Sequence, residues 1–181
     1  VMNYGQIYFT DVANGIGCRT SFFVSGCTHH CKGCFNDMTW DFSYGQPYTK
    51  EVEQQIIDSL KPSYIAGLSL LGGEPMELQN QKEIRPLLER VKAEVPHATI
   101  WIYSGYTWEE LNDPSNRRCH GEDTEAILRM TDILVDGEFV LDKKDIGLQF
   151  RGSSNQRIID VKKTLKEGQV VLSEYHTKTE A

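Results

Sequence analysis

Three cysteines lie close together in one short segment, residues 24–35, whose sequence is VSGCTHHCKGCF. Cys27, Cys31 and Cys34 have the spacing C-x3-C-x2-C, and His29 and His30 lie between the first two of them. Thiolates are soft ligands that select zinc, copper(I) or iron–sulfur clusters. The chain has five cysteines, an odd number, and three of them share this segment. Both facts argue against a disulfide framework and indicate a metal or redox site.

Two kinds of metal group are compatible with this spacing. A structural zinc ion takes four protein ligands, so His29 or His30 would have to complete the set. Both histidines lie in the short span between Cys27 and Cys31, where reaching the same ion strains the loop. A [4Fe–4S] cluster held by three cysteines instead leaves one iron open to bind a substrate or cofactor directly. The spacing favours the iron–sulfur cluster, and a zinc-binding interaction module without catalysis stays open as the alternative.

The elements that must position the cysteines follow from the apolar patterns. Short apolar runs predict strands at 20–26, 65–73, 98–105 and 132–137, and apolar residues at helical spacing predict helices at 49–62, 82–95, 107–112 and 124–131. Thr49 is a predicted N-cap, and Pro86 has to lie in the first turn of its helix or kink it. The residues from 113 to 123 are predicted to form a polar loop, and those from 138 to 161 irregular structure with one or two strands.

The alternation of strands and helices predicts an α/β fold with a parallel sheet. With about four strand–helix units, a complete eight-stranded barrel is impossible, so a partial barrel or an open sheet remains. Ligands of such folds bind at the carboxyl ends of the strands. The cysteines follow the first predicted strand, Gly72 and Gly73 end the second, and Ser104 ends the third. The three segments are therefore expected to meet at one rim.

The run Gly72-Gly73-Glu74-Pro75, together with the cysteine motif and the aromatic Phe35 after it, resembles the radical S-adenosylmethionine superfamily. Each motif stands at a strand end, in the order that this superfamily shows. The resemblance narrows to the activating proteins of the anaerobic ribonucleoside-triphosphate reductase, and it covers residues 3–157. The segments that carry it are NGIGCRTSFFVSGCTHHCKGCFN, GQPYTKE, LVDGEFV and RGSSNQR. It implies a short partial (β/α) barrel with parallel strands and flanking helices.

The same resemblance implies a glycyl-radical-generating enzyme. One [4Fe–4S] cluster per chain would cleave S-adenosylmethionine reductively, and the resulting 5′-deoxyadenosyl radical would take hydrogen from a C-terminal glycine of the reductase. The implied partners are the reductase and a reduced flavodoxin or a similar electron donor. An activase of another glycyl-radical enzyme, or a radical enzyme acting on a small molecule, remains an alternative.

The resemblance also assigns roles to individual residues. Cys27, Cys31 and Cys34 are the implied iron ligands, and no side chain is assigned a catalytic role because the cluster and S-adenosylmethionine carry the radical chemistry. The implied contacts to S-adenosylmethionine are made by Gly33, Cys34, Phe35, Gly72, Gly73, Glu74 and Ser104. Within this set, the backbone of residues 33–35 and the Phe35 ring face the adenine, and Glu74 accepts from the methionine ammonium group.

Two interpretations stay open for Arg151, Asn155 and Gln156. These residues either contact the cofactor or the partner, or belong to a hydrogen-bonded surface loop. Cys18 is expected to be a small buried residue. Cys119 is expected to be an exposed thiol rather than a metal ligand, and the histidines are expected to be surface or loop residues.

Composition sets the wider limits. The chain has 181 residues, 39% apolar and 25% charged, with a formal net charge of −7. We expect one radical S-adenosylmethionine domain over 1–165 and a flexible tail over 166–181. The negative charge predicts no nucleic-acid partner, and no apolar run is long enough to predict a membrane span. The N-terminal residues lack the pattern of a secretory signal, so we expect a cytoplasmic protein.

Overall fold

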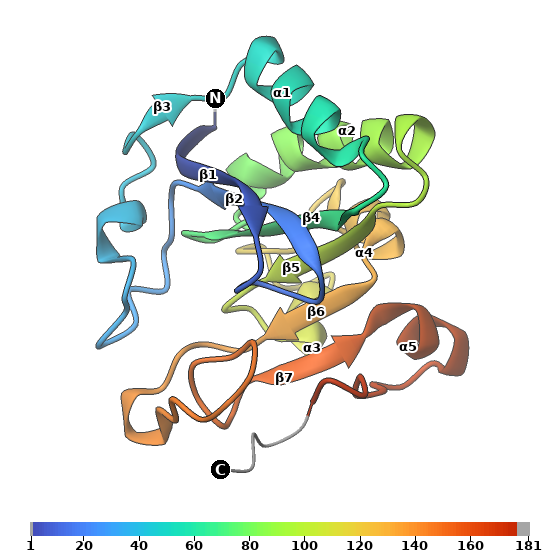
Figure 1. Ribbon diagram of the computed structural model, residues 1–181. Helices are drawn as coiled ribbons and strands as arrows, with labels where there is room; N and C mark the ends of the chain where they lie inside the picture. The colour runs from blue at the N-terminus through green and yellow to red at the C-terminus, as the bar shows by residue number, and fades with distance from the viewer. Residues whose placement is uncertain (1, 177–181) are drawn as a thin grey trace.

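One seven-stranded sheet organises the chain, and the computed structural model describes residues 2–176 (Figure 1). The strands follow the order β3-β1-β2-β4-β5-β6-β7. Their bounds are β1 Asn3–Asp11, β2 Cys18–Val24, β3 Gln46–Pro47, β4 Ile65–Gly72, β5 Thr99–Tyr103, β6 Ile133–Asp136 and β7 Arg157–Asp160. Strands β2, β4, β5 and β6 are parallel neighbours, whereas β1, β3 and β7 pair antiparallel at the two sides. The predicted α/β class with parallel strands is confirmed, and the sheet is open.

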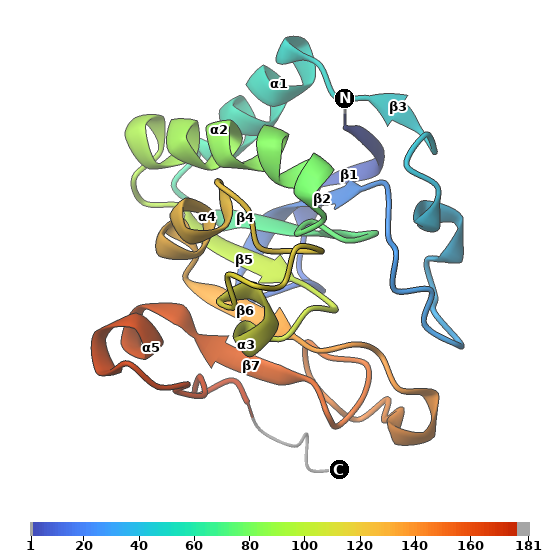
Figure 2. The same ribbon diagram turned by 180° about the vertical axis from the view of Figure 1, so that it is seen from behind.

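Helices connect the parallel strands, and one further helix follows β7. They are α1 Lys50–Leu60, α2 Leu78–Glu94, α3 Trp108–Leu111, α4 Thr124–Met130 and α5 Val161–Glu167, with short 3-10 helices η1 Asp37–Trp40 and η2 Leu141–Lys143. Helices α1, α2 and α4 cover one face of the sheet (Figure 2). The main core lies between them and alternate strand residues such as Leu68, Leu70 and Ile102, all fully buried. This alternation is what a strand buried on one face by helices requires.

The predicted elements are present, with two informative differences. Strand β1 was not predicted, because its sequence NYGQIYFTD mixes polar residues and glycine with few apolar ones. Helix α2 begins at Leu78 rather than at residue 82, so Pro86 lies inside the helix and not in its first turn. The additional turn contains Asn80 and Gln81, which are buried but bind backbone carbonyls of neighbouring segments. Because these buried positions are polar, the apolar periodicity of the sequence does not predict the first turn of the helix.

The opposite face of the sheet carries a smaller core, in which the buried residues are Trp101, Ile133, Val135 and Ile158. Tyr175 packs on Trp101 with a ring-centroid distance of 5.8 Å, and Leu172 forms a bridge with Ile159 of β7. The predicted domain boundary after residue 165 falls inside α5, and the chain beyond it packs against the sheet as far as His176. The remaining part of the predicted tail, 177–181, lies outside the described residues.

Within residues 2–176, no helix has the length and apolar character that crossing a membrane requires.

Candidate iron–sulfur and cofactor site

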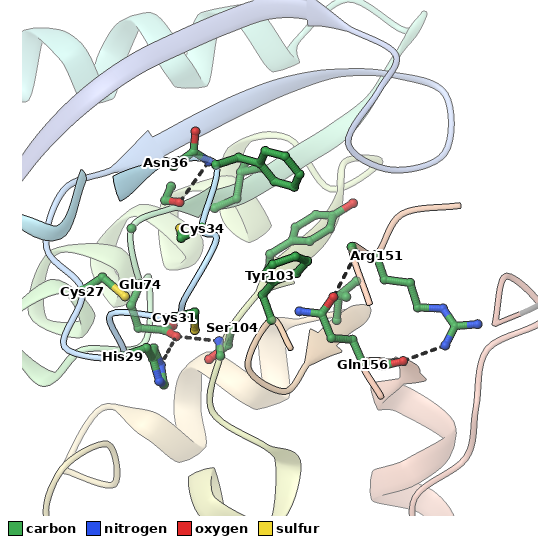
Figure 3. Close-up of a pocket in the computed structure, with 18 of the residues that line it drawn as sticks. Cys27, His29, Cys31, Cys34, Asn36, Glu74, Tyr103, Ser104, Arg151 and Gln156 are labelled. Atoms are coloured by element: carbon green, nitrogen blue, oxygen red, sulfur yellow. Dashed lines mark hydrogen bonds and ion pairs between the residues drawn. The ribbon is translucent and has the colours of Figure 1, made fainter. Parts of the chain in front are cut away.

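A cavity of about 410 Å³ opens at the carboxyl ends of the parallel strands, where the sequence predicts the rim (Figure 3). Cys27, Cys31 and Cys34 all line it. The other lining residues come from the β1–β2 loop, the cysteine loop after β2, the ends of β4, β5 and β6, and the segment between β6 and β7: Ala13, Asn14, His29, Phe35, Asn36, Leu71, Gly72, Gly73, Glu74, Tyr103, Ser104, Gly105, Val135, Gly137, Phe139, Phe150, Arg151, Gly152 and Gln156. A cavity of this size is typical of a small-molecule site.

The cysteine loop is held to its surroundings through the backbone. The Cys27 N–H donates to the Trp40 carbonyl at 3.2 Å, and the Cys34 N–H donates to the Cys31 carbonyl at 3.1 Å. Cys27 is buried, and burial followed by the nearby Glu74 charge raises the pKa of its thiol to about 12. Burial also raises the pKa of Cys31. Thiolates here are stable only when a cation neutralises them, as happens when a metal group displaces the protons.

His29 has a specific structural role that the sequence did not indicate. Its side chain is only 4% exposed, with Nε2 2.8 Å from Glu74 Oε1 and Nδ1 2.7 Å from Glu138 Oε2. These bonds outweigh the effect of burial and raise the pKa of His29. His29 lies in a loop, as expected, but its side chain is enclosed between two carboxylates instead of lying on the surface. Its partners lie 45 and 109 residues away in the chain, so local spacing carries no signal for them.

The histidines do not complete a zinc site. Both ring nitrogens of His29 are bound to carboxylates, and the His30 ring stacks on Trp40 with an interplanar angle of 13°. Among residues 2–176, no three His, Cys, Asp or Glu side chains converge closely enough to hold a single metal ion. Three cysteines around a cavity, with His29 and His30 engaged elsewhere, are a donor set that would fit an iron–sulfur cluster better than a single zinc ion.

The glycines at the rim permit close approach of the two loops. Gly72 has φ +131°, and a side chain there would collide with the backbone of Val24. A Cβ on Gly73 would lie 2.6 Å from the Val24 carbonyl oxygen and 2.9 Å from that of Gly26. The GGEP run thus packs directly against the segment that leads into the cysteine loop. Gly33, with φ +79°, needs the same conformational freedom within the loop itself.

Glu74 is almost completely buried, and protein groups occupy three of its acceptor positions. Oε1 accepts from His29 and from the Gly105 N–H at 2.7 Å, and Oε2 accepts from the Met76 N–H at 2.9 Å. A carboxylate offers about four such positions. Glu74 therefore links three segments of the chain through hydrogen bonds. The contacts within residues 2–176 leave one acceptor position on Oε2 for a ligand.

Ser104 and Phe35, two further predicted contacts, both line the cavity. The Ser104 hydroxyl accepts from the Tyr106 N–H at 3.0 Å, which leaves its own proton for a ligand. Phe35 is 66% exposed at the mouth, beside Phe139 and beneath the Lys144 ammonium at 4.8 Å. An exposed aromatic ring at a pocket mouth is well placed to cover a planar ligand.

The segment RGSSNQR, residues 151–157, forms a hydrogen-bonded loop against the wall of the cavity. Gln156 accepts from the Gly152 N–H at 2.8 Å and donates to the Gly137 carbonyl at 2.9 Å, while Arg151 donates to the Gln156 carbonyl at 2.7 Å. Asn155 donates to the Glu138 carbonyl at 2.8 Å. Arg151 and Gln156 line the cavity, whereas Asn155 does not.

The cysteines outside the motif lie apart from the site. Cys18 is half-buried and packs against the main core. Cys119 is fully buried, so the expectation of an exposed thiol is wrong, because the polar loop around it folds back onto Gln81. Its thiol faces the Glu110 carbonyl, while His120 binds the Leu111 carbonyl, so the two do not form a metal pair.

Comparison with known proteins agrees with this geometry. The family model described as "4Fe-4S single cluster domain" matches residues 13–159, which include the cysteine loop and most of the cavity. Three relatives are named anaerobic ribonucleoside-triphosphate reductase-activating protein. The protein from Vibrio cholerae is 47% identical over 87% of this chain and 97% of its own length. That of Escherichia coli K12 is 45% identical over 86% and 96%, and that of Enterobacteria phage T4 is 38% identical over 87% and 93%.

Similarity of this extent covers the strands, the cysteine loop and the rim together. The chain therefore belongs to the family of anaerobic ribonucleoside-triphosphate reductase-activating proteins and contains that family's 4Fe–4S single cluster domain.

Proposed function

We propose that this chain activates an anaerobic ribonucleoside-triphosphate reductase by generating a glycyl radical on it. The observation that carries the proposal is that three cysteines, and no fourth within residues 2–176, open onto a cavity at the ends of the parallel strands. A bound [4Fe–4S] cluster supplies one electron and an open iron for S-adenosylmethionine, whose reductive cleavage yields the 5′-deoxyadenosyl radical that takes hydrogen from the reductase glycine.

The protein's part in this chemistry is to hold the cluster, to orient the bound cofactor and to exclude water from the site. Cys27, Cys31 and Cys34 hold the cluster, and their raised pKa values mean that Cys27 and Cys31 give up protons when it binds. Glu74 joins the cysteine loop to the ends of β4 and β5, so the ligands and the cofactor-binding edge keep one geometry. The apolar side chains of Leu71, Val135 and Phe150 form part of the cavity wall and limit the access of water there.

The contacts to S-adenosylmethionine proposed here follow the wall of the cavity. The backbone of Gly72 and Gly73, with the remaining position on Glu74, faces the methionine ammonium group. The Ser104 hydroxyl donates to a polar group of the same ligand. Gly33, Cys34 and Phe35 form the part of the wall that takes the adenine, with the exposed Phe35 ring covering it.

We also propose that the open sheet is a short form of the partial (β/α) barrel of radical S-adenosylmethionine enzymes. Four parallel strands with helices over one face and ligand-binding loops at their carboxyl ends support this assignment. A reduced flavodoxin or similar protein as the electron donor, and a location in the cytoplasm, complete the proposal.

The decisive experiment mixes the reduced, cluster-loaded chain with S-adenosylmethionine and the reductase in the absence of oxygen. A glycyl-radical doublet in the electron paramagnetic resonance spectrum of the reductase is expected, and Cys31→Ala is expected to abolish it. Cleavage of S-adenosylmethionine without that doublet would indicate another substrate. One equivalent of zinc without sulfide in the anaerobically reconstituted chain would refute the radical chemistry altogether.

A further inference from the structure

A buried carboxylate that the proposed mechanism does not use contacts the cysteine loop. Glu77, the N-cap residue directly before α2, is 4% exposed. It accepts from the Thr28 N–H at 2.9 Å and from the Thr28 hydroxyl at 3.2 Å. Thr28 directly follows Cys27 in the chain. Glu77 therefore holds both the backbone and the side chain of the residue next to the first cysteine.

A third hydrogen bond fixes Glu77 from the other side. The Tyr106 hydroxyl donates a hydrogen bond to Glu77 Oε1, and Tyr106 itself is fully buried in the loop after β5. Burial, reinforced by the bond to Glu77, raises the pKa of Tyr106, so the phenol keeps its proton and donates it. The carboxylate thus has a fixed position between two segments of the site that are distant in sequence.

Arg118 closes this network at the surface. Its guanidinium donates to the Thr28 hydroxyl oxygen at 2.8 Å and lies over the Tyr106 ring at 5.1 Å from the centroid. The Thr28 hydroxyl can therefore accept from Arg118 while it donates to Glu77, which satisfies its hydrogen-bonding capacity on both sides. Three segments of the chain, those of Glu77, Tyr106 and Arg118, converge on the single threonine that follows Cys27.

We propose that Glu77 is a positioning residue for Cys27: through Thr28 it holds the cysteine loop in the conformation that binds the cluster. The identity of the bound group rests on the proposed function. Charged hydrogen-bond acceptors of this kind are stronger than neutral ones, and removing Glu77 leaves the Thr28 N–H without this acceptor. The negative charge of Glu77 acts on Cys27, so it would also disfavour reduction of a cluster held by that cysteine and lower its reduction potential.

The test uses the full chain, reconstituted anaerobically with iron and sulfide. Glu77→Ala is expected to lose cluster content several-fold, and Glu77→Gln, whose amide oxygen still accepts from Thr28, is expected to restore much of it with a more positive midpoint potential. Tyr106→Phe is expected to show a smaller loss. The matched control is Tyr48→Phe, because Tyr48 also donates to a glutamate, Glu53, at 2.8 Å, but this pair makes no hydrogen bond to Thr28 of the cysteine loop.

Iron and sulfide content, the midpoint potential and the melting temperature of the cluster-free chain separate the possible outcomes. A lower melting temperature with unchanged cluster content and potential in Glu77→Gln and Tyr106→Phe would overturn the proposal and leave Glu77 a purely structural residue. If Glu77→Ala does not fold, these two variants decide alone. A wild-type chain that takes up no iron and sulfide would refute the proposed function instead, and the two failures are therefore distinguishable.

Discussion

The His29 imidazole lies 2.8 Å from the Glu74 carboxylate, and this contact joins the cysteine loop to the end of β4. Both side chains are nearly inaccessible to solvent. His29, which lies between two cysteines of the motif, thus links the two rim segments. This contact holds the cysteine loop and the GGEP run together, although 45 residues separate His29 from Glu74 in the chain.

Replacing Glu74 with glutamine is expected to lower the free energy of unfolding of the cluster-free chain by about 1–3 kcal/mol. Both oxygens of Glu74 accept from backbone N–H groups, those of Met76 and Gly105. The amide NH₂ of glutamine would face one of these N–H groups and leave it without an acceptor. Denaturant-induced unfolding measures this loss. Glu110→Gln is the matched control, since Glu110 belongs to the capping box of α3, where glutamine serves equally well. Equal unfolding midpoints for the two variants would contradict the role assigned to Glu74.

A methyl group on Gly72 is expected to prevent the two rim loops from approaching. Gly72→Ala would combine a φ of +131° with a collision against the Val24 backbone, so we expect a loss of several kcal/mol or failure to fold. Gly168→Ala is the control, because Gly168 has φ +73° and its added methyl group would meet no described atom within 4 Å. It should cost about 1 kcal/mol from the backbone alone. Thermal melts of both variants compare the two effects, and similar melting temperatures would refute the close-approach argument.

Loss of one cysteine of the motif is expected to remove the cluster. Cys31→Ala should fall to a small fraction of the wild-type iron and sulfide content, whereas Cys18→Ala should keep it, because Cys18 packs against the main core instead of the cavity. Chemical analysis after anaerobic reconstitution, with visible absorption spectra, measures the difference. Wild-type iron content in Cys31→Ala would show that the ligand assignment is wrong.

Phe35→Ala is expected to separate ligand binding from stability. Its side chain is 66% exposed, so the unfolding free energy of the cluster-free chain should change by no more than about 0.5 kcal/mol. Loss of the aromatic cover should weaken S-adenosylmethionine binding to the cluster-loaded chain about tenfold, a loss of the size measured for aromatic contacts. Equilibrium binding of S-adenosylmethionine tests this, and unchanged affinity would remove Phe35 from the proposed contacts.

His176 gives a pH dependence that can be assigned to one residue. Its Nδ1 accepts from the Ile158 N–H at 3.0 Å, and burial, with Arg151 and Arg157 nearby, lowers its pKa below the usual 6.5. The unfolded chain therefore binds the proton first as pH falls. The contribution of His176 to stability is complete above pH 6.5 and decreases as pH drops below it.

His176→Gln, whose amide oxygen can still accept the hydrogen bond, is expected to lose less stability than the wild type between about pH 8 and about pH 5.5. Denaturant unfolding of both cluster-free proteins at several pH values measures the difference between them. Parallel curves would mean that His176 does not titrate differently in the folded and unfolded chain.

The sequence alone predicted the chemistry of the site and the order of its parts. Cys27, Cys31 and Cys34 carry soft sulfur donors and lie close together in the chain, so their spacing predicts a shared metal or cluster site. Apolar periodicity predicted the parallel strands, and strand direction then placed Gly72 and Ser104 at the same rim as the cysteines. These features depend on neighbouring residues, which a local pattern records.

Tertiary structure alone decided which polar side chains support that site. His29, Glu77 and Tyr106 acquire their hydrogen-bonding roles from partners that are at least 29 residues away in the chain, and local sequence does not reveal those partners. Burial of Cys119 likewise follows from a polar loop folding onto α2. Hydrogen bonds between distant segments form only after the sheet has brought the strand ends together, so no local periodicity predicts them.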